Sequence, residues 1–195
     1  MNQLVFLVAL LFNGGSNHQL HVAVDTCSLV RSSYEKLIAN KSVVNEVNYI
    51  NCFPKKFSTF VSVFGYRKDI SNHSYKMSCL YTSSQDYIQK FFNVNHIHKS
   101  ILYNHIINIS KNSFWQSDAV TFFQLKTIEL ITNDVNFLRF LNNQDEVTLN
   151  NFFKFILLNP YNDLEKKQEL KKYFKKYAKI NIFYARFLEK NPKYH

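Results

Sequence analysis

The stretch Phe57-Ser-Thr-Phe-Val-Ser-Val-Phe64 carries the pattern that decides the fold. Its apolar side chains recur at positions i, i+3, i+4 and i+7, which is the spacing of one face of an α-helix. Pro54 stands shortly before the stretch and Gly65 directly after it, the order in which proline and glycine mark the two ends of a helix. The stretch therefore predicts an amphipathic helix whose aromatic face is buried.

Helical spacing of apolar residues returns almost throughout the rest of the chain. Several segments open on a serine or aspartate that can cap a helix, and the last one is the longest, with Ile180-Asn181-Ile182 as the place where it could break. Residues 66–82 lack such a period and predict the main loop. The segments with helical spacing are 30–50, 83–92, 97–110, 117–131, 134–141, 145–157 and 163–189.

Length and composition agree with a helical domain. The chain has 195 residues, which is the usual size of one domain. Two of its three glycines precede residue 17, so glycine-rich phosphate loops and dinucleotide fingerprints are excluded. Three prolines and one remaining glycine also argue against an all-β protein. The sequence predicts a single all-α domain over residues 17–195, with seven or eight helices packed as an irregular bundle or as stacked helical pairs.

The N-terminus predicts export. Residues 4–12 are nine consecutive apolar residues, too few to span a bilayer but typical of a signal-peptide core. Gly14 and Ser16 supply small residues at the two positions that a signal peptidase reads. We therefore expect residues 1–16 to be a cleaved signal peptide and the mature chain to be periplasmic or secreted. The alternative is a buried N-terminal strand or helix.

Three cysteines lie within the first 80 residues. In an oxidising compartment an odd number indicates one disulfide and one remaining thiol. The pairs Cys27–Cys52 and Cys52–Cys79 would each tie the N-terminal third together, and the sequence does not choose between them. We take Cys27–Cys52 as the working assignment. Three thiols buried in the core are the alternative.

The histidines give the only hint of catalytic chemistry. His98 and His105 are seven residues apart, so on a helix they would share a face and could offer two metal ligands. With Cys79 as a third group they would make a small exported hydrolase or metal-dependent protein. No metalloprotease or nucleophile-elbow motif accompanies them. We therefore predict no catalytic residue, no metal and no cofactor, with histidines that face solvent or the core.

Basic residues gather at the C-terminal end. The net charge is +10, and residues 163–195 hold ten basic against four acidic residues. Such a segment can be a solvated face behind a buried stripe, an anionic-membrane-surface helix over residues 163–179, or a docking face for an acidic protein. Lysine provides no bidentate phosphate recognition, and we expect no nucleic-acid partner. The lysines of greatest interest are Lys171, Lys172, Lys175 and Lys176.

Two loop segments complete the candidate partner-binding residues. Tyr66, Arg67 and Lys68 open the aperiodic segment that follows Gly65. Trp115 stands in a polar loop before a predicted helix, where it either anchors an interface or plugs the end of the bundle. The high aromatic content also leaves a monomer and a homodimer as alternatives.

Three blocks share a close spacing of aromatic side chains: Phe57-Ser-Thr-Phe-Val-Ser-Val-Phe-Gly-Tyr66, Leu80-Tyr-Thr-Ser-Ser-Gln-Asp-Tyr-Ile-Gln-Lys-Phe-Phe92 and Phe114-Trp-Gln-Ser-Asp-Ala119. They resemble segments of small exported proteins from AT-rich bacteria, some of which are similar to periplasmic immunity proteins. Those proteins neutralise toxins delivered by contact-dependent or type VI secretion. The resemblance carries over no functional residue. Together with export, an all-α domain, absent catalytic motifs and an uneven basic surface, it leads to the hypothesis of a non-enzymatic inhibitor that occludes the active site of an acidic toxin or enzyme.

Overall fold

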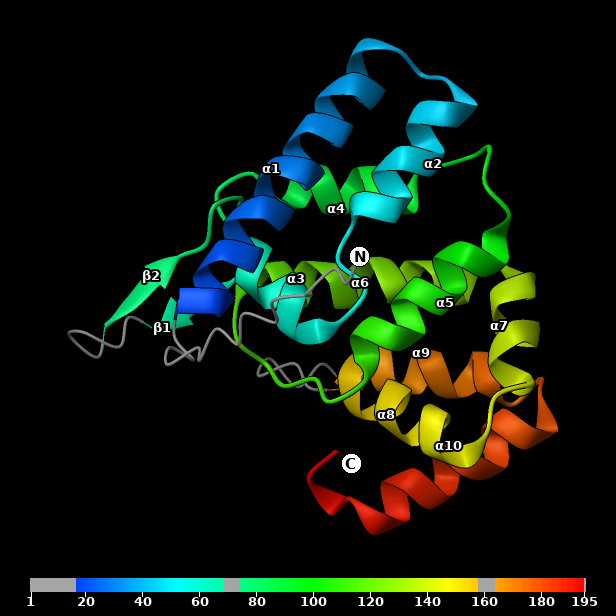
Figure 1. Ribbon diagram of the computed structural model, residues 1–195. Coiled ribbons are helices and arrows are strands. Elements are labelled where there is room, and N and C mark those ends of the chain that lie inside the picture. Colours follow the sequence, from blue (N-terminus) through cyan, green and yellow to red (C-terminus); the bar gives the residue numbers. More distant parts are fainter. Residues whose placement is uncertain (1–16, 69–73, 158–163, 195) are drawn as a thin grey trace, which may run out of the picture.

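The computed structural model describes residues 17–68, 74–157 and 164–194. The described residues form ten α-helices, a short 3₁₀ helix and one two-stranded sheet, so the all-α prediction is confirmed (Figure 1). The helices are more numerous than the seven or eight expected. The predicted signal peptide, residues 1–16, lies outside the described residues. None of the helices in the described part of the chain is long and apolar enough to cross a membrane.

The elements follow one another in the order helices, hairpin, helices. The helices α1 to α3 precede a β-hairpin, and α4 to α10 follow it (Figure 1). Their bounds are α1 Asn17–Ala39, α2 Val43–Cys52, α3 Phe57–Phe64, β1 Tyr66–Lys68, β2 Tyr75–Met77, α4 Ser84–Phe92, α5 Lys99–Ser110, α6 Asp118–Asn133, α7 Val135–Asn142, α8 Glu146–Leu157, α9 Leu164–Phe174, α10 Ala178–Lys190 and the 3₁₀ helix Pro192–Tyr194.

Two expected helices are each divided in two. Residues 30–50 fall on α1 and α2, because Ser42 caps α2 by accepting a hydrogen bond from the Asn45 N–H. The C-terminal segment breaks at residues 175–177, not at 180–182 as expected. Because of the break, Phe174 of α9 and Tyr184 of α10 both reach the ring of Phe153 on α8. Burial of these aromatic rings stabilises the chain more than the backbone hydrogen bonds of an uninterrupted helix would.

A hairpin replaces part of the loop expected over residues 66–82. Strands β1 and β2 are antiparallel, with Tyr66 opposite Met77, Arg67 opposite Lys76 and Lys68 opposite Tyr75. Strands of three residues are too short for an alternating pattern to be recognised in the sequence.

Aromatic rings fill the core. Helix α6 lies in the middle and contacts α4, α7, α8 and α9. The ring of Phe123 on α6 lies with its centroid 5.1–6.5 Å from five other phenyl rings. Those rings come from α3, α4 and α8 and from the residue that follows α2, so one side chain joins most of the layers. The five partners are Phe53, Phe60, Phe91, Phe92 and Phe155.

A disulfide joins Cys27 on α1 to Cys79, with their Cα atoms 6.3 Å apart. The working assignment Cys27–Cys52 is therefore wrong, and Cys52 is a free, half-buried thiol at the end of α2. After β2 the chain reaches α1, and there Arg31 of α1 donates a hydrogen bond to the Cys79 carbonyl at 3.5 Å. Disulfides of this kind form and persist in oxidising compartments.

Candidate protein-binding surface

The side chain of Gln116 holds the hairpin against the loop between α5 and α6. Its Oε1 accepts a hydrogen bond from the Tyr66 N–H at 3.2 Å, and its Nε2 donates to the Tyr66 carbonyl at 2.5 Å. A single amide thus occupies the outer edge of β1 as a neighbouring strand would. We call residues 66–68, 74–77 and 114–116 the hairpin surface.

Backbone conformation makes this contact possible. A Cβ atom on Gly65 would lie 2.2 Å from the Gln116 Oε1, so only glycine lets the amide approach so closely. Asn112 adopts a φ of 54°, the left-handed region that asparagine tolerates better than most residues. Gly65, directly before β1, and Asn112, in the loop between α5 and α6, therefore both help the loop to approach the hairpin.

Two aromatic side chains of the loop are exposed and yet held in place. Trp115 is 42% exposed, and its Nε1 donates to the Thr121 Oγ1 at 3.1 Å. Phe114 is 55% exposed and packs edge-on against Phe57 with centroids 5.0 Å apart. Because their orientations are already fixed, contact with a partner would cost little side-chain entropy. Exposed aromatic surface of this kind is typical of interfaces. The sequence favoured a Trp115 that plugs the end of the bundle, a position in which we would expect the ring to be buried.

A chain of hydroxyl groups supports the base of the hairpin. The Tyr66 hydroxyl donates to the Tyr81 hydroxyl at 2.7 Å, and the Tyr81 hydroxyl donates to the Asp118 carboxylate at 3.4 Å. The hydrogen bond with Tyr66, followed by burial and the nearby Asp118 charge, raises the pKa of Tyr81 far above its usual range. Tyr81 therefore stays protonated and keeps donating to Asp118.

The structure brings together the four loop residues that the sequence singled out. Tyr66, Arg67 and Lys68 form β1, and Gln116, the residue after Trp115, hydrogen-bonds to Tyr66. Sequence reasoning missed Tyr75 and Met77, which are 68% and 56% exposed on β2, because they fall in a segment without period. Their presence adds apolar area to a basic surface.

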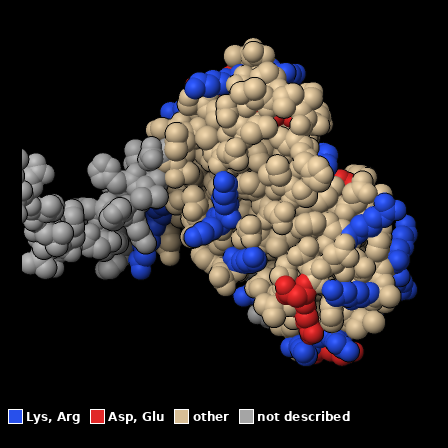
Figure 2. All heavy atoms as spheres, turned by 45° about the vertical axis from the view of Figure 1, so that its right-hand side comes forward, with Lys and Arg blue, Asp and Glu red and all other residues tan. Residues whose placement is uncertain are grey.

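The predicted lysines lie elsewhere. Helix α9 packs on α6 and α10. On the face shown in Figure 2, Lys and Arg side chains occur at the top and in the middle as well as in the lower part, where acidic side chains lie among them. Leu170 and Phe174 of the apolar stripe are buried in the core, so the stripe is not free to enter a membrane. The exposed lysines there are Lys171, Lys172, Lys175 and Lys176.

The three residues of the hydrolase or metal-site alternative each have other contacts in the structure. His98 caps α5 through its Nδ1, and the Cys79 sulfur is bonded to Cys27. His105 is buried beside the Ile101 carbonyl, and burial lowers the pKa of His105. Among the described residues, no group of three or more His, Cys, Asp or Glu side chains could hold a metal ion.

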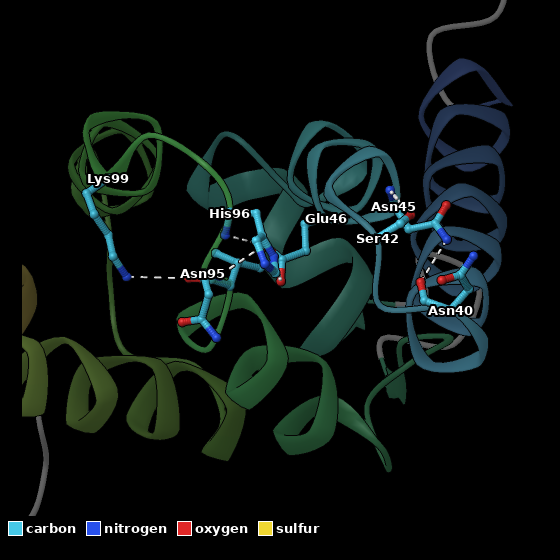
Figure 3. A network of polar contacts seen from close by, with 8 residues as sticks. Asn40, Ser42, Asn45, Glu46, Asn95, His96 and Lys99 are labelled. Carbon is cyan, nitrogen blue, oxygen red and sulfur yellow. Dashed lines mark hydrogen bonds and ion pairs between the residues drawn. The ribbon is translucent and has the colours of Figure 1, made fainter.

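Glu46 on α2 forms a buried polar network (Figure 3). It is 3% exposed, and its Oε2 accepts from the backbone N–H groups of Asn95 and His96 at 2.9 and 2.6 Å. Its Oε1 lies 3.2 Å from the His96 Nδ1. Burial opposes the charge, but these hydrogen bonds outweigh it and hold the pKa of Glu46 below its usual range. Glu46 thereby fixes the loop between α4 and α5 to α2.

We expect Glu46→Gln to lower the free energy of unfolding by about 2 kcal/mol at pH 7, since hydrogen bonds to a charged acceptor are the stronger ones. The pKa of Glu46 is lower in the folded chain than its ordinary value of 4.5. The stabilisation is therefore complete above about pH 4.5 and is lost as the pH falls through the folded pKa. Urea unfolding of both chains between pH 7 and pH 3 should show the difference shrinking. A constant difference would contradict this assignment.

No protein-family model, curated protein or solved structure matches this chain. The resemblance to exported immunity proteins therefore stays a prediction.

Proposed function

We propose that this chain is a periplasmic or secreted binding protein, an immunity-type inhibitor that neutralises a secreted bacterial toxin or enzyme by occluding its active site. The contact surface in this proposal is the hairpin surface. The proposal is supported above all by the Gln116 contact, which holds aromatic and basic side chains from segments 50 residues apart in one rigid surface. A preorganised surface loses less entropy on binding than a flexible one. The disulfide is compatible with an exported protein.

The chemistry of the surface fits an acidic partner. Arg67 and Lys68 follow Tyr66 on β1, and Gln116, which binds Tyr66, directly follows Trp115 in the chain. Aromatic and arginine side chains are the residue types that contribute most to interfaces. The lysines at the end of α9 lie outside the contact and attract an acidic protein over a distance. Charge on the hairpin surface therefore determines how long a complex lasts, whereas charge on α9 determines how fast it forms.

The test starts from capture of the tagged chain from its own source in low and moderate salt. We expect one stoichiometric protein, and its affinity is then measured with two matched double variants. Arg67→Glu with Lys68→Glu should weaken binding at least tenfold, mainly through faster dissociation. Lys175→Glu with Lys176→Glu should slow association and leave dissociation unchanged. Absence of a stoichiometric partner, or equal effects of the two variants on dissociation, would contradict the proposal.

A further inference from the structure

Helix α5 depends on two histidines that carry no added proton. The first is His98, which precedes the helix and whose Nδ1 accepts a hydrogen bond from the Ser100 N–H at 3.4 Å. The same Nδ1 lies 2.6 Å from the Ser100 Oγ. A protonated Nδ1 is a donor and could accept no bond from Ser100. No acidic residue stands in the first turn of α5, and Lys99 adds a positive charge where a helix favours a negative one.

The second is His105, which lies inside the molecule with one ring nitrogen unpartnered. It is 7% exposed, and its ring packs edge-on against Phe91 of α4 with centroids 5.9 Å apart. Its Nδ1 lies 3.1 Å from the Ile101 carbonyl, to which it can only donate, so the added proton of a charged ring has to sit on Nε2. Among the described residues, this buried Nε2 has no hydrogen-bond partner. A charge on His105 is therefore costly.

The charged groups around α5 do not offset such a charge. Burial lowers the pKa of His105 below its ordinary value of 6.5; the Ile101 carbonyl opposes this shift, and the positive charge of Lys55 adds to it. Helix α3, which packs on α5, carries no charged side chain. The other described charged side chains on or next to the helices that contact α5 are all at least partly exposed: Asp86 and Lys90 on α4, Asp134 before α7, Arg139 on α7, and Glu146 and Lys154 on α8.

His96, in the loop before α5, responds to acid in the opposite direction. Its Nδ1 lies 3.2 Å from the Glu46 Oε1, so a proton on the His96 ring strengthens this contact (Figure 3). The pKa of Glu46 lies below 4.5, which leaves its carboxylate charged at pH 5. Between pH 7 and pH 5 the loop therefore stays fixed to α2, while α5 itself loses support.

Both parts of the hairpin surface are attached to elements that rest on α5. The segment 114–116 follows α5 after a short loop, and its Phe114 packs against Phe57 of α3. Strand β1 follows α3 through Gly65 alone, and α3 contacts α5. Loosening of α5 therefore reaches both sides of the contact between Gln116 and the hairpin.

We propose that α5 is an acid-sensitive helix that controls the hairpin surface. When His105 and His98 take up protons, α5 loosens, and the Gln116 contact loosens with it. Because the pKa of His105 is lower in the folded chain, the opened helix binds more protons than the closed one. The stabilisation is therefore complete above about pH 6.5 and decreases as the pH falls toward the folded pKa. A partner is then held at neutral pH and released in acid, and this last step alone rests on the proposed function.

Amide hydrogen exchange of the full chain at pH 7 and pH 5, measured by NMR and corrected for intrinsic rates, tests the helix directly. We expect the protection of the α5 amides to fall about tenfold, within the limit of tenfold per pH unit for each histidine that takes up a proton on opening. The N–H groups of Asn95 and His96 should keep their protection, because Glu46 holds them. Trp115 is the only tryptophan of the chain, and its fluorescence should change over the same pH range.

Three variants separate the histidines. His105→Phe keeps a ring against Phe91 and cannot be protonated, so its α5 protection should depend much less on pH. His96→Asn is the matched control, since it removes a neighbouring histidine that forms no bond within α5, and its α5 should still open in acid. His98→Asp, at an exposed position, keeps an acceptor in the cap at pH 5 and should also reduce the loss, so the test stands even if His105→Phe fails to fold.

Equal protection of α5 at pH 7 and pH 5, an equal loss in α5 and α10, or an undiminished loss in His105→Phe would overturn the inference. A loss in α5 without a change at Trp115 would overturn its control of the hairpin surface. None of these results needs a partner, so they are distinct from a failure of the proposed function. A captured partner should lose more affinity in acid with the unsubstituted chain than with His105→Phe, and an equal loss would overturn the release step.

Discussion

Replacing Phe123 by alanine should lower the free energy of unfolding by about 4 kcal/mol, within the range for large-to-small changes of buried aromatic residues. Phe123 is fully buried on α6, and its ring contacts rings from α3, α4 and α8 and from the residue after α2. A cavity there cannot be closed by moving one helix, since each neighbour is held by the others. The loss would be a large part of the 5–15 kcal/mol typical of a folded domain.

The matched control is Phe123→Leu, which keeps most of the volume and should cost less than half as much. Urea unfolding of both variants measures the difference, with circular dichroism to confirm the helical fold. A loss below 2 kcal/mol for Phe123→Ala would mean that the core refills the space, and that α6 is not the centre of the packing.

Removal of the Cys27–Cys79 disulfide should have an effect of similar size. The bond spans 52 residues, and the loop-closure relation for that length gives about 4 kcal/mol of stabilisation at 25 °C. The double variant Cys27→Ser with Cys79→Ser should lose this amount. In thermal unfolding, reducing agent should lower the melting temperature of the unsubstituted chain and leave that of the variant unchanged.

Cys52→Ser provides the control for this experiment, because Cys52 is free. Its melting temperature should stay close to that of the unsubstituted chain, and it should remain sensitive to reducing agent. If Cys52→Ser removed that sensitivity and Cys79→Ser did not, the disulfide would join Cys27 to Cys52.

Patterns between residues that are near one another in the sequence were enough to predict the helices. Helix α3 begins at Phe57 and ends at Phe64, as the spacing and Gly65 predicted. Asp134 caps α7 by accepting from the N–H groups of Asn136 and Phe137. In both cases the determining groups lie within a few residues of one another, so the sequence alone contains the necessary information.

Contacts between distant segments did not follow from the sequence. The pairing of Cys27 with Cys79 depends on the hairpin, whose three-residue strands leave no recognisable period. The candidate surface could be predicted only in part. The sequence identified Arg67 and Trp115 separately, but it gave no sign that Gln116, a polar loop residue, would hydrogen-bond to Tyr66 of the hairpin. Gly65 marks the end of α3 in the sequence, and its lack of a Cβ atom also makes room for that amide.

The hydrogen bonds between Gln116 and Tyr66 join positions 50 apart in the chain, so they require both the hairpin and the loop between α5 and α6 to be in place. The surface on which a partner would act is then complete only when both halves of the molecule have folded. A partner that recognises it discriminates finished chains from unfinished ones, and by mass action it shifts the equilibrium toward them. At a free concentration 100 times its dissociation constant, such a partner adds about 2.7 kcal/mol of stability.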